Sequence, residues 1–281
     1  MPELPEVETI KRTLERFVLG KTIDAITVQW PKIIKHPDDI IHFEQLLVGE
    51  TIRKMGRHGK FLLFYFDDVV LVSHLRMEGK YRVVDKNEPM DKHTHVIFHF
   101  TDGTELRYND VRKFGTMHVF PIGTELTVAP LQTLGPDPFH PTYTKPYVKE
   151  KLLKTTRLIK AALLDQTIIA GLGNIYVDEV LFLAKVHPER RSNTLTEKEL
   201  DAIFYYAYEV LDKAVMQGGT TIRSYVDGEG EMGMFQQQLF AYGQEDEPCK
   251  HCNDVIVKIK VAGRGTHYCP TCQKTTKIIK Q

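Results

Sequence analysis

The sequence lacks any apolar stretch long enough to cross a lipid bilayer. Its longest uninterrupted apolar run covers residues 61–66, whereas a membrane-spanning helix needs about 20 apolar residues. The first ten residues are acidic and lack the basic and apolar regions of a secretory signal peptide. No low-complexity tract or internal repeat is present. We therefore expect a globular protein of the cytoplasm with no membrane partner.

Cysteine is missing from the first 248 residues, and all four cysteines lie between positions 249 and 272. A disulfide-stabilised secreted protein usually spreads its cysteines through the fold. Two residues separate Cys249 from Cys252 and Cys269 from Cys272, and sixteen lie between the pairs. This spacing is typical of a zinc ion held by four thiolates, which leave no coordination position for water. We expect one structural Zn²⁺, with two disulfides or a redox dithiol as the alternatives.

The chain also lacks a net charge, since 37 Lys and Arg residues balance 37 Asp and Glu residues. The local distribution is uneven: residues 249–281 carry seven basic and one acidic side chain, and residues 224–248 carry six acids and no Lys or Arg. Salt screens charges beyond roughly 8–10 Å, so a bound polyanion senses the local charge. We predict a hairpin over 255–268 that turns at Gly263-Arg264-Gly265 and presents Arg264 to phosphate.

The order of patterns along the chain predicts an α+β protein of several domains. Residues 5–18 repeat apolar side chains at helical spacing. Short β-rich runs then predict a sandwich or barrel, with strands at 22–30, 51–57, 61–66, 69–75, 80–84, 95–100, 104–108 and 116–120. Helical patterns follow at 147–164, 174–184 and 196–217. The expected divisions are an N-terminal domain 1–133, a linker 134–146, a helical domain 147–240 and a zinc finger 241–281.

Proline at position 2 has two interpretations. Its position alone favours a helix-start proline, which is common. Removal of Met1 would instead expose a secondary amine with a pKa of about 8, against about 10.4 for lysine, so that roughly a hundredfold larger fraction is unprotonated at neutral pH. Such an amine can attack a sugar carbon and form an iminium ion, which acts as an electron sink.

Several motifs, in order, make the sequence resemble the formamidopyrimidine-DNA glycosylase (8-oxoguanine DNA glycosylase) family. They are residues 1–8, 73–79, 110–115, 171–176 and 263–266, together with the cysteine pairs. The resemblance spans essentially the whole chain. It implies an N-terminal helix with an eight-stranded β-sandwich, then a helix–two-turn–helix domain with a C-terminal β-ribbon zinc finger. It also implies a monomer that binds double-stranded DNA containing an oxidised purine.

The resemblance further implies a bifunctional enzyme that removes the base through Pro2 and then cuts the strand by β,δ-elimination. It gives Glu3 the proton transfers, Lys60 the phosphate contact and sugar-ring opening, and Arg264 phosphate binding and δ-elimination. Glu6, one helical turn from Glu3, is a weaker candidate for the same network. The plainer alternatives are a helix-dipole carboxylate for Glu3 and solvated charges for Lys60 and Arg264.

A base inside a duplex must leave the stack before an enzyme can act on it. Three residues match the family's void fillers, and their polar neighbours indicate loop tips rather than core: Met77, Arg112 and Phe114. The further DNA contacts expected by resemblance are His74, His93, Asn174 and Tyr242. The lesion-capping loop is expected at Thr220, Thr221, Ile222, Arg223, Ser224 and Tyr225.

Two other functions stay open at this point. Endonuclease VIII-like glycosylases share the Pro2 and Glu3 chemistry and prefer oxidised pyrimidines. Leu4 stands where that branch usually has glycine, and the void-filling set also favours purines. A zinc-ribbon protein that binds DNA without catalysis is the second alternative, and it predicts no covalent adduct with damaged DNA.

Overall fold

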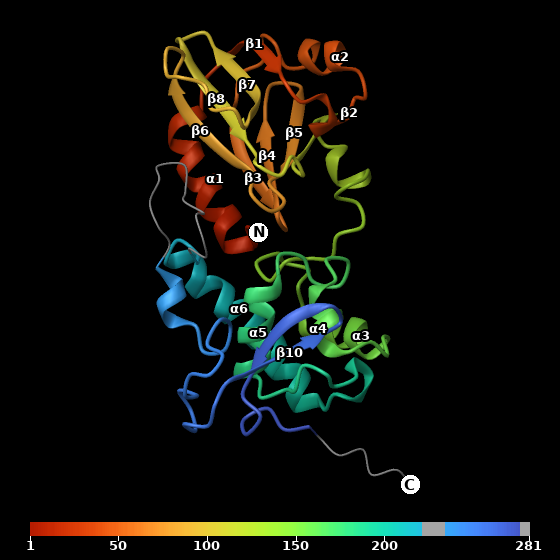
Figure 1. The fold of residues 1–281 in the computed structure, drawn as a ribbon. Helices are drawn as coiled ribbons and strands as arrows, with labels where there is room; N and C mark the ends of the chain where they lie inside the picture. The colour runs from red at the N-terminus through yellow and green to blue at the C-terminus, as the bar shows by residue number, and fades with distance from the viewer. Residues whose placement is uncertain (221–233, 276–281) are drawn as a thin grey trace. The chain divides into compact units, whose positions relative to one another are not determined.

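The computed structural model describes residues 1–220 and 234–275, which form two compact units. The first unit comprises Met1–Thr133 and a later segment that begins at Gly218, and the second comprises Leu134–Gln217 and the chain from Met234 onward. Figure 1 traces the chain through both units. Within the described ranges, no helix combines the length and the apolar character that crossing a membrane requires.

Two sheets build the first unit. One has the order β1-β7-β8-β6, with β1 (Ile23–Val28), β7 (Thr94–Phe100), β8 (Thr104–Asn109) and β6 (Lys80–Asp85). The other has the order β2-β9-β5-β4-β3, with β2 (Ile34–His36), β9 (Thr116–Pro121), β5 (Val69–His74), β4 (Phe61–Tyr65) and β3 (Lys54–His58). All eight predicted strands are present. The additional strand, β2, has three residues and pairs in parallel with β9, so it is too short to show a sequence period.

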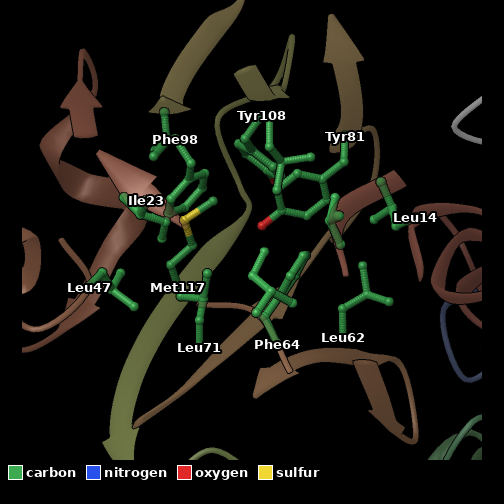
Figure 2. Close-up of a cluster of buried hydrophobic side chains, with 14 of the residues drawn as sticks. Leu14, Ile23, Leu47, Leu62, Phe64, Leu71, Tyr81, Phe98, Tyr108 and Met117 are labelled. Atoms are coloured by element: carbon green, nitrogen blue, oxygen red, sulfur yellow. The ribbon is translucent and has the colours of Figure 1, made fainter. Parts of the chain in front are cut away.

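The two sheets share one hydrophobic core. Figure 2 shows Phe98 of β7 and Tyr108 of β8 among the same cluster as Phe64 of β4, with Leu14 of helix α1 at its edge. Helix α1 (Leu4–Val18) buries the apolar face that its sequence period predicts. Each large apolar side chain buried in this way stabilises the fold by about 1.5–3 kcal/mol. The start of α1 is thereby held against a rigid sandwich.

The second unit is helical and ends in a ribbon. Its helices are α3 (Lys145–Leu153), α4 (Ile159–Leu164), α5 (Asn174–Leu183) and α6 (Glu197–Met216), and its ribbon strands are β10 (Val257–Val261) and β11 (Arg264–Tyr268). The smaller elements of the described chain are α2 (Ile40–Gln45) and 3-10 turns at Pro31–Ile33, Glu125–Thr127, Ser192–Thr194 and Phe235–Gln238. The predicted α+β class, with a helical domain and a C-terminal ribbon, is confirmed.

Two local predictions need correction. The single helical pattern over 147–164 is two helices, because Thr155 Oγ1 accepts the backbone N–H of Arg157 at 3.3 Å and competes with helical pairing. The ribbon turns at Ala262-Gly263 rather than at Gly263-Arg264-Gly265, since Val261 pairs with Arg264. Both turn residues have positive φ (47° and 79°), as a two-residue hairpin turn requires. Arg264 is therefore the first residue of β11.

Candidate functional site

Pro2 and Glu3 directly precede the first turn of α1. Met1 is 49% exposed, whereas Pro2 and Glu3 are buried. Glu3 is the N-cap residue and forms a capping box with Glu6, whose Oε2 accepts the Glu3 backbone N–H at 2.9 Å. Glu3 thus caps the start of α1, as its plainer alternative predicts. It also lies next to the buried Pro2, where the proton-transfer role would place it.

Glu6 has a second set of partners far along the chain. Its Oε1 accepts the backbone N–H of Thr220 at 2.8 Å and the Thr220 hydroxyl at 3.1 Å. A Cβ atom on Gly219 would lie 2.7 Å from the same oxygen, so this close approach depends on glycine. Glu6 therefore ties the start of α1 to Thr220, the first residue of the predicted lesion-capping loop. Thr221, Ile222, Arg223, Ser224 and Tyr225 lie outside the described residues.

Lys60 and His74 lie at neighbouring strand ends. Lys60 follows Gly59 in the turn between β3 and β4, and the next residue, Phe61, pairs with His74 of β5. Lys60 is only 5% exposed, which contradicts the alternative of a solvated surface charge. Burial, followed by the positive charges of Arg76 and Lys60, lowers the pKa of His74 to about 3. His74 Nδ1 accepts the Arg76 N–H at 2.9 Å, so a neutral ring can donate through Nε2.

Glu8 links α1 to the turn that carries Lys60. Its Oε2 accepts from Arg57 Nε at 3.0 Å, and Arg57 Nη1 donates to the Gly59 carbonyl at 2.9 Å. Burial raises the pKa of Glu8, but the charge of Lys11 and the hydrogen bonds from Arg12 and Arg57 outweigh it and lower the pKa overall. Glu8 therefore stays ionised and joins two candidate catalytic elements.

The three predicted void fillers lie in exposed turns. Met77 is 39% exposed and Phe114 is 52% exposed, and each follows a non-glycine residue with positive φ, Arg76 (52°) and Lys113 (59°). The guanidinium of Arg112 lies over the Phe114 ring, 4.8 Å from its centroid. This left-handed backbone is uncommon for residues with a Cβ atom, so each turn must be stabilised by its surroundings. His93, half-buried, lies at the end of a turn in which its N–H donates to Asp91.

The four cysteines gather in the second unit, with all four Sγ atoms within 4.8 Å of one another. The Sγ atoms of Cys249 and Cys272 lie 3.9 Å apart, and those of Cys252 and Cys269 lie 3.5 Å apart. A tetrahedral zinc site with Zn–S bonds of about 2.3 Å separates its sulfur atoms by roughly 3.8 Å. The cluster therefore fits one structural Zn²⁺, and disulfide bonding is contradicted because all four thiols are free.

Arg264 is exposed at the start of β11, beside the ribbon turn. The Asn174 side-chain amide, at the start of α5, donates to the Gly265 carbonyl at 2.9 Å. Asp178 on the next turn of α5 accepts the His267 backbone N–H at 2.9 Å and forms a buried ion pair with Lys160. The ribbon is therefore fastened to α5 through Gly265 and His267, which follow Arg264 in β11. Asn174, expected as a phosphate contact, uses its amide within the protein.

Glu179 positions the chain that enters the zinc ribbon. Its two oxygens accept the backbone N–H groups of Phe240, Ala241 and Tyr242 at 2.8–2.9 Å. Burial raises the pKa of Glu179 to about 6, and these three hydrogen bonds oppose that rise. Tyr242 also packs edge-on against His267, with ring centroids 5.1 Å apart. No local pattern in the sequence distinguished Glu179 from an ordinary helical glutamate.

The candidate residues divide between the units. Those of the first unit are Pro2, Glu3, Glu6, Lys60, His74, Met77, His93, Arg112, Phe114 and Thr220, and those of the second are Asn174, Tyr242, Arg264 and the four cysteines. Within the units, the structure joins Glu3 with Glu6 and Thr220, Lys60 with His74, Arg112 with Phe114, and Asn174 with the Arg264 ribbon.

The first unit is a β-sandwich, and the second is helical with a zinc ribbon. Each unit presents an exposed basic turn, so the chain has the features of a zinc-finger protein that binds a polyanion. Three family profiles match the chain: the formamidopyrimidine-DNA glycosylase N-terminal domain (residues 1–117), the H2TH domain of the same enzymes (134–226), and the zinc finger found in FPG and IleRS (246–275). The chain belongs to the formamidopyrimidine-DNA glycosylase family.

Relatives match the chain over its whole length. It is 61% identical to the formamidopyrimidine-DNA glycosylase of Oceanobacillus iheyensis, with 100% of each chain covered. It is 55% identical to that of Bacillus subtilis, covering 97% of this chain and 99% of the relative. A Lactococcus lactis FPG mutant in complex with Fapy-dG containing DNA superposes with a TM-score of 0.92 at 43% identity, covering 98% of this chain and 100% of that one.

Proposed function

We propose that this protein excises oxidised purines, 8-oxoguanine and formamidopyrimidines, from duplex DNA and then cleaves the strand at the abasic site. Family membership supports this function, as do the complexes formed by similar proteins. The Lactococcus lactis relatives were solved with DNA containing Fapy-dG and with DNA containing an abasic site. The observation that carries the residue-level mechanism is the buried Pro2-Glu3 pair at the capped start of α1.

The first step is nucleophilic displacement by the Pro2 amine. After Met1 is removed, the Pro2 nitrogen attacks C1′, the C1′–N bond to the damaged base breaks, and the base leaves with a proton. Opening of the sugar breaks C1′–O4′, and O4′ takes a proton from Glu3. The product is an iminium between Pro2 and C1′, whose positive charge is permanent because a secondary amine leaves no N–H to lose.

Strand cleavage follows from the acidity of that iminium. Loss of a proton from C2′ sends electrons to the iminium, and the C3′–O3′ bond breaks with departure of the phosphate. A second elimination removes the C4′ proton and breaks C5′–O5′ with departure of the other phosphate, and water then hydrolyses the iminium and frees Pro2. In this scheme Lys60 binds the phosphate of the target nucleotide and Arg264 supports the second elimination.

Extrusion of the damaged nucleotide leaves a gap that costs a few kcal/mol in lost stacking. Met77 and Phe114, both exposed, have the apolar surface to fill it, and Arg112 has donors for the cytosine left without a partner. His74, His93, Asn174 and Tyr242 supply further DNA contacts, and the segment from Thr220 to Tyr225 covers the lesion. Zinc supplies no chemistry in this scheme and stabilises the ribbon.

The test is covalent trapping with borohydride. We expect the processed protein to form a reduced adduct with an 8-oxoguanine·C duplex, and Pro2→Gly to form little or none, because the primary amine of glycine gives an imine without a permanent positive charge. A protein that retains Met1 should also form none, since an amide nitrogen is not a nucleophile. Gel shift of the adduct and mass mapping of the linked residue provide the measurement.

A thymine-glycol duplex forms the second arm of the same experiment. A Lactococcus lactis Fpg was solved with DNA containing an oxidised pyrimidine, so the trapping rates on the two lesions must be compared. Faster trapping on thymine glycol would favour an endonuclease VIII-like preference. A folded, zinc-loaded protein that binds both duplexes and traps neither would establish a binding protein without catalysis.

The place of action follows from the substrate. The relatives from Oceanobacillus iheyensis and Bacillus subtilis are bacterial proteins, and bacterial chromosomal DNA lies in the cytoplasm. We accordingly propose the cytoplasm as the site of activity, with the protein associated with the nucleoid through DNA.

A further inference from the structure

We propose that Asp110 and Tyr108 form a buried positioning node that holds the Met77 turn and the Arg112–Phe114 turn in the arrangement needed to fill the gap in DNA. Neither residue is exposed enough to touch DNA, with Asp110 at 1% and Tyr108 at 0% exposure. This inference rests on the proposed function. It adds two residues that act through others.

Both side-chain oxygens of Asp110 are used to build the Arg112–Phe114 turn. Its Oδ1 accepts the backbone N–H of Arg112 at 3.0 Å. Its Oδ2 accepts the N–H of Phe114 at 2.9 Å and that of Gly115 at 2.8 Å. Three hydrogen bonds from amides to one carboxylate are charge-assisted and short. They hold the turn at Lys113, whose backbone has positive φ.

The main chain of Asp110 ties the same turn to the segment that carries His93. Its N–H donates to the His93 carbonyl at 3.0 Å, and its carbonyl accepts from Nε2 of the buried His95 at 2.8 Å. The Asp110 backbone therefore cannot move independently of strand β7. A candidate DNA contact, His93, shares its support with the void-filling turn.

Tyr108 connects this turn with the Met77 turn. Its hydroxyl donates to Asp110 Oδ2 at 3.4 Å. A Cβ atom on Gly115 would lie 1.7 Å from the same hydroxyl oxygen, and one on Gly79 would lie 2.3 Å from it. Gly79 closes the Met77 turn through its N–H, which donates to the Leu75 carbonyl at 2.9 Å. One buried phenol therefore packs against both turns, and each turn meets it with a glycine.

This construction solves a physical problem that exposed wedges create. Exposure of the apolar side chains of Met77 and Phe114 to water is unfavourable, and folding back onto the protein would lower their free energy. A turn held by buried hydrogen bonds prevents that collapse and lowers the ordering cost of binding. The node should therefore act on the step that exchanges a stacked base for protein side chains, and on recognition of the opposite base by Arg112.

The experiment measures kcat/KM for 8-oxoguanine opposite cytosine and opposite adenine, with cleavage of a single-stranded abasic oligonucleotide as the reference reaction. In Asp110→Asn, an NH₂ group replaces an oxygen that accepts N–H groups. We expect activity on the 8-oxoguanine·C duplex to fall about 10- to 100-fold, the range for lost hydrogen bonds to a charged group. The cytosine-to-adenine preference should fall with it, while single-stranded abasic cleavage stays within about twofold of wild type.

Tyr108→Phe is the second variant, because it keeps the packed ring and removes only the hydroxyl. It should lower the duplex activity and the opposite-base preference in the same direction by about 2- to 10-fold, as expected for one neutral hydrogen bond. Asp85→Asn is the matched control. Asp85 also holds a turn through a backbone N–H, that of Asn87 at 2.8 Å, at the end of β6, and this change should move none of the three rates.

The outcomes separate the two proposals. If wild-type protein fails to excise 8-oxoguanine from the duplex and cleave the strand, the proposed function itself is wrong. If wild type cleaves it and Asp110→Asn keeps the full opposite-base preference, the node is wrong and the function stands. Equal losses on all three substrates with a lowered melting temperature would assign Asp110 a purely structural role. If Asp110→Asn does not fold, an unchanged preference in Tyr108→Phe would overturn the node.

Discussion

The turn at residues 110–115 and the ribbon at 257–268 present a similar group by different means. Each holds an exposed arginine, Arg112 or Arg264, beside a backbone with positive φ. The first turn is part of a β-sandwich with a large core, and one carboxylate, that of Asp110, accepts three of its backbone N–H groups. The ribbon stands on a small cluster around Cys249 and Cys269. A small core supplies little stability, so the ribbon depends on metal.

Removing zinc should have the largest effect, because it should unfold the ribbon and leave the turn at residues 110–115 intact. Structural zinc contributes on the order of 10 kcal/mol to small zinc domains, so Cys269→Ser should unfold the ribbon and weaken DNA binding by more than about a hundredfold. Fluorescence anisotropy with a damaged duplex measures the affinity, and elemental analysis measures the zinc. Thr271→Ser, between Cys269 and Cys272, should retain the DNA affinity and the zinc, because the serine hydroxyl can still donate to Asp254. Unchanged DNA affinity in metal-free protein would show that the ribbon does not need zinc for binding.

Replacing the ribbon arginine should produce a smaller effect. Arg264→Ala should lower affinity by about tenfold and reduce the slope of log K against log salt by roughly one, as one phosphate contact is lost. Lys154→Ala is the control, because Lys154 is exposed at the end of α3 and already pairs with Glu150. A slope that stays the same in Arg264→Ala would exclude this residue from the phosphate contacts.

Acid should lower the stability of the first unit through His74. The pKa of His74 is lowered to about 3 in the folded protein, whereas an unfolded histidine has a pKa of about 6.5. The unfolded state therefore binds more protons between these values, and stability that is complete above pH 6.5 is lost as pH falls toward 3.

For His74, this loss should be on the order of 1 kcal/mol per pH unit inside that window. His74→Gln should flatten the pH dependence of the unfolding free energy, measured by urea denaturation. His42→Gln, at an exposed position on α2, should leave it unchanged. Equal slopes for wild type and His74→Gln would show that His74 does not titrate in this range.

The sequence was sufficient for the features that depend on local patterns. All eight longer strands of the sandwich follow from alternation and turn residues, and the metal cluster follows from cysteine spacing. It was not sufficient for β2, which has three residues, or for the break after Leu153, where Thr155 bonds to the backbone. Both depend on contacts that a periodicity does not record.

The candidate site shows the same division. Pro2, Glu3 and Lys60 were predicted from motifs, and the void fillers from motifs and their polar neighbours. The residues that support them were missed or ranked low, because Glu8, Asp110 and Glu179 act by accepting hydrogen bonds from distant backbone or side chains. A buried carboxylate in such a role has the same local sequence as a surface carboxylate.

The pairing of Glu6 with Thr220 spans 214 positions of the chain. During synthesis, the segment that carries Glu6 emerges first, yet the donors for Glu6 Oε1 emerge only after most of the polypeptide has been made. A fragment ending at residue 133 would contain the whole sandwich and still lack these donors. The contact between Glu6 and Thr220 can therefore form only late in synthesis, after the helices α3 to α6 have been translated.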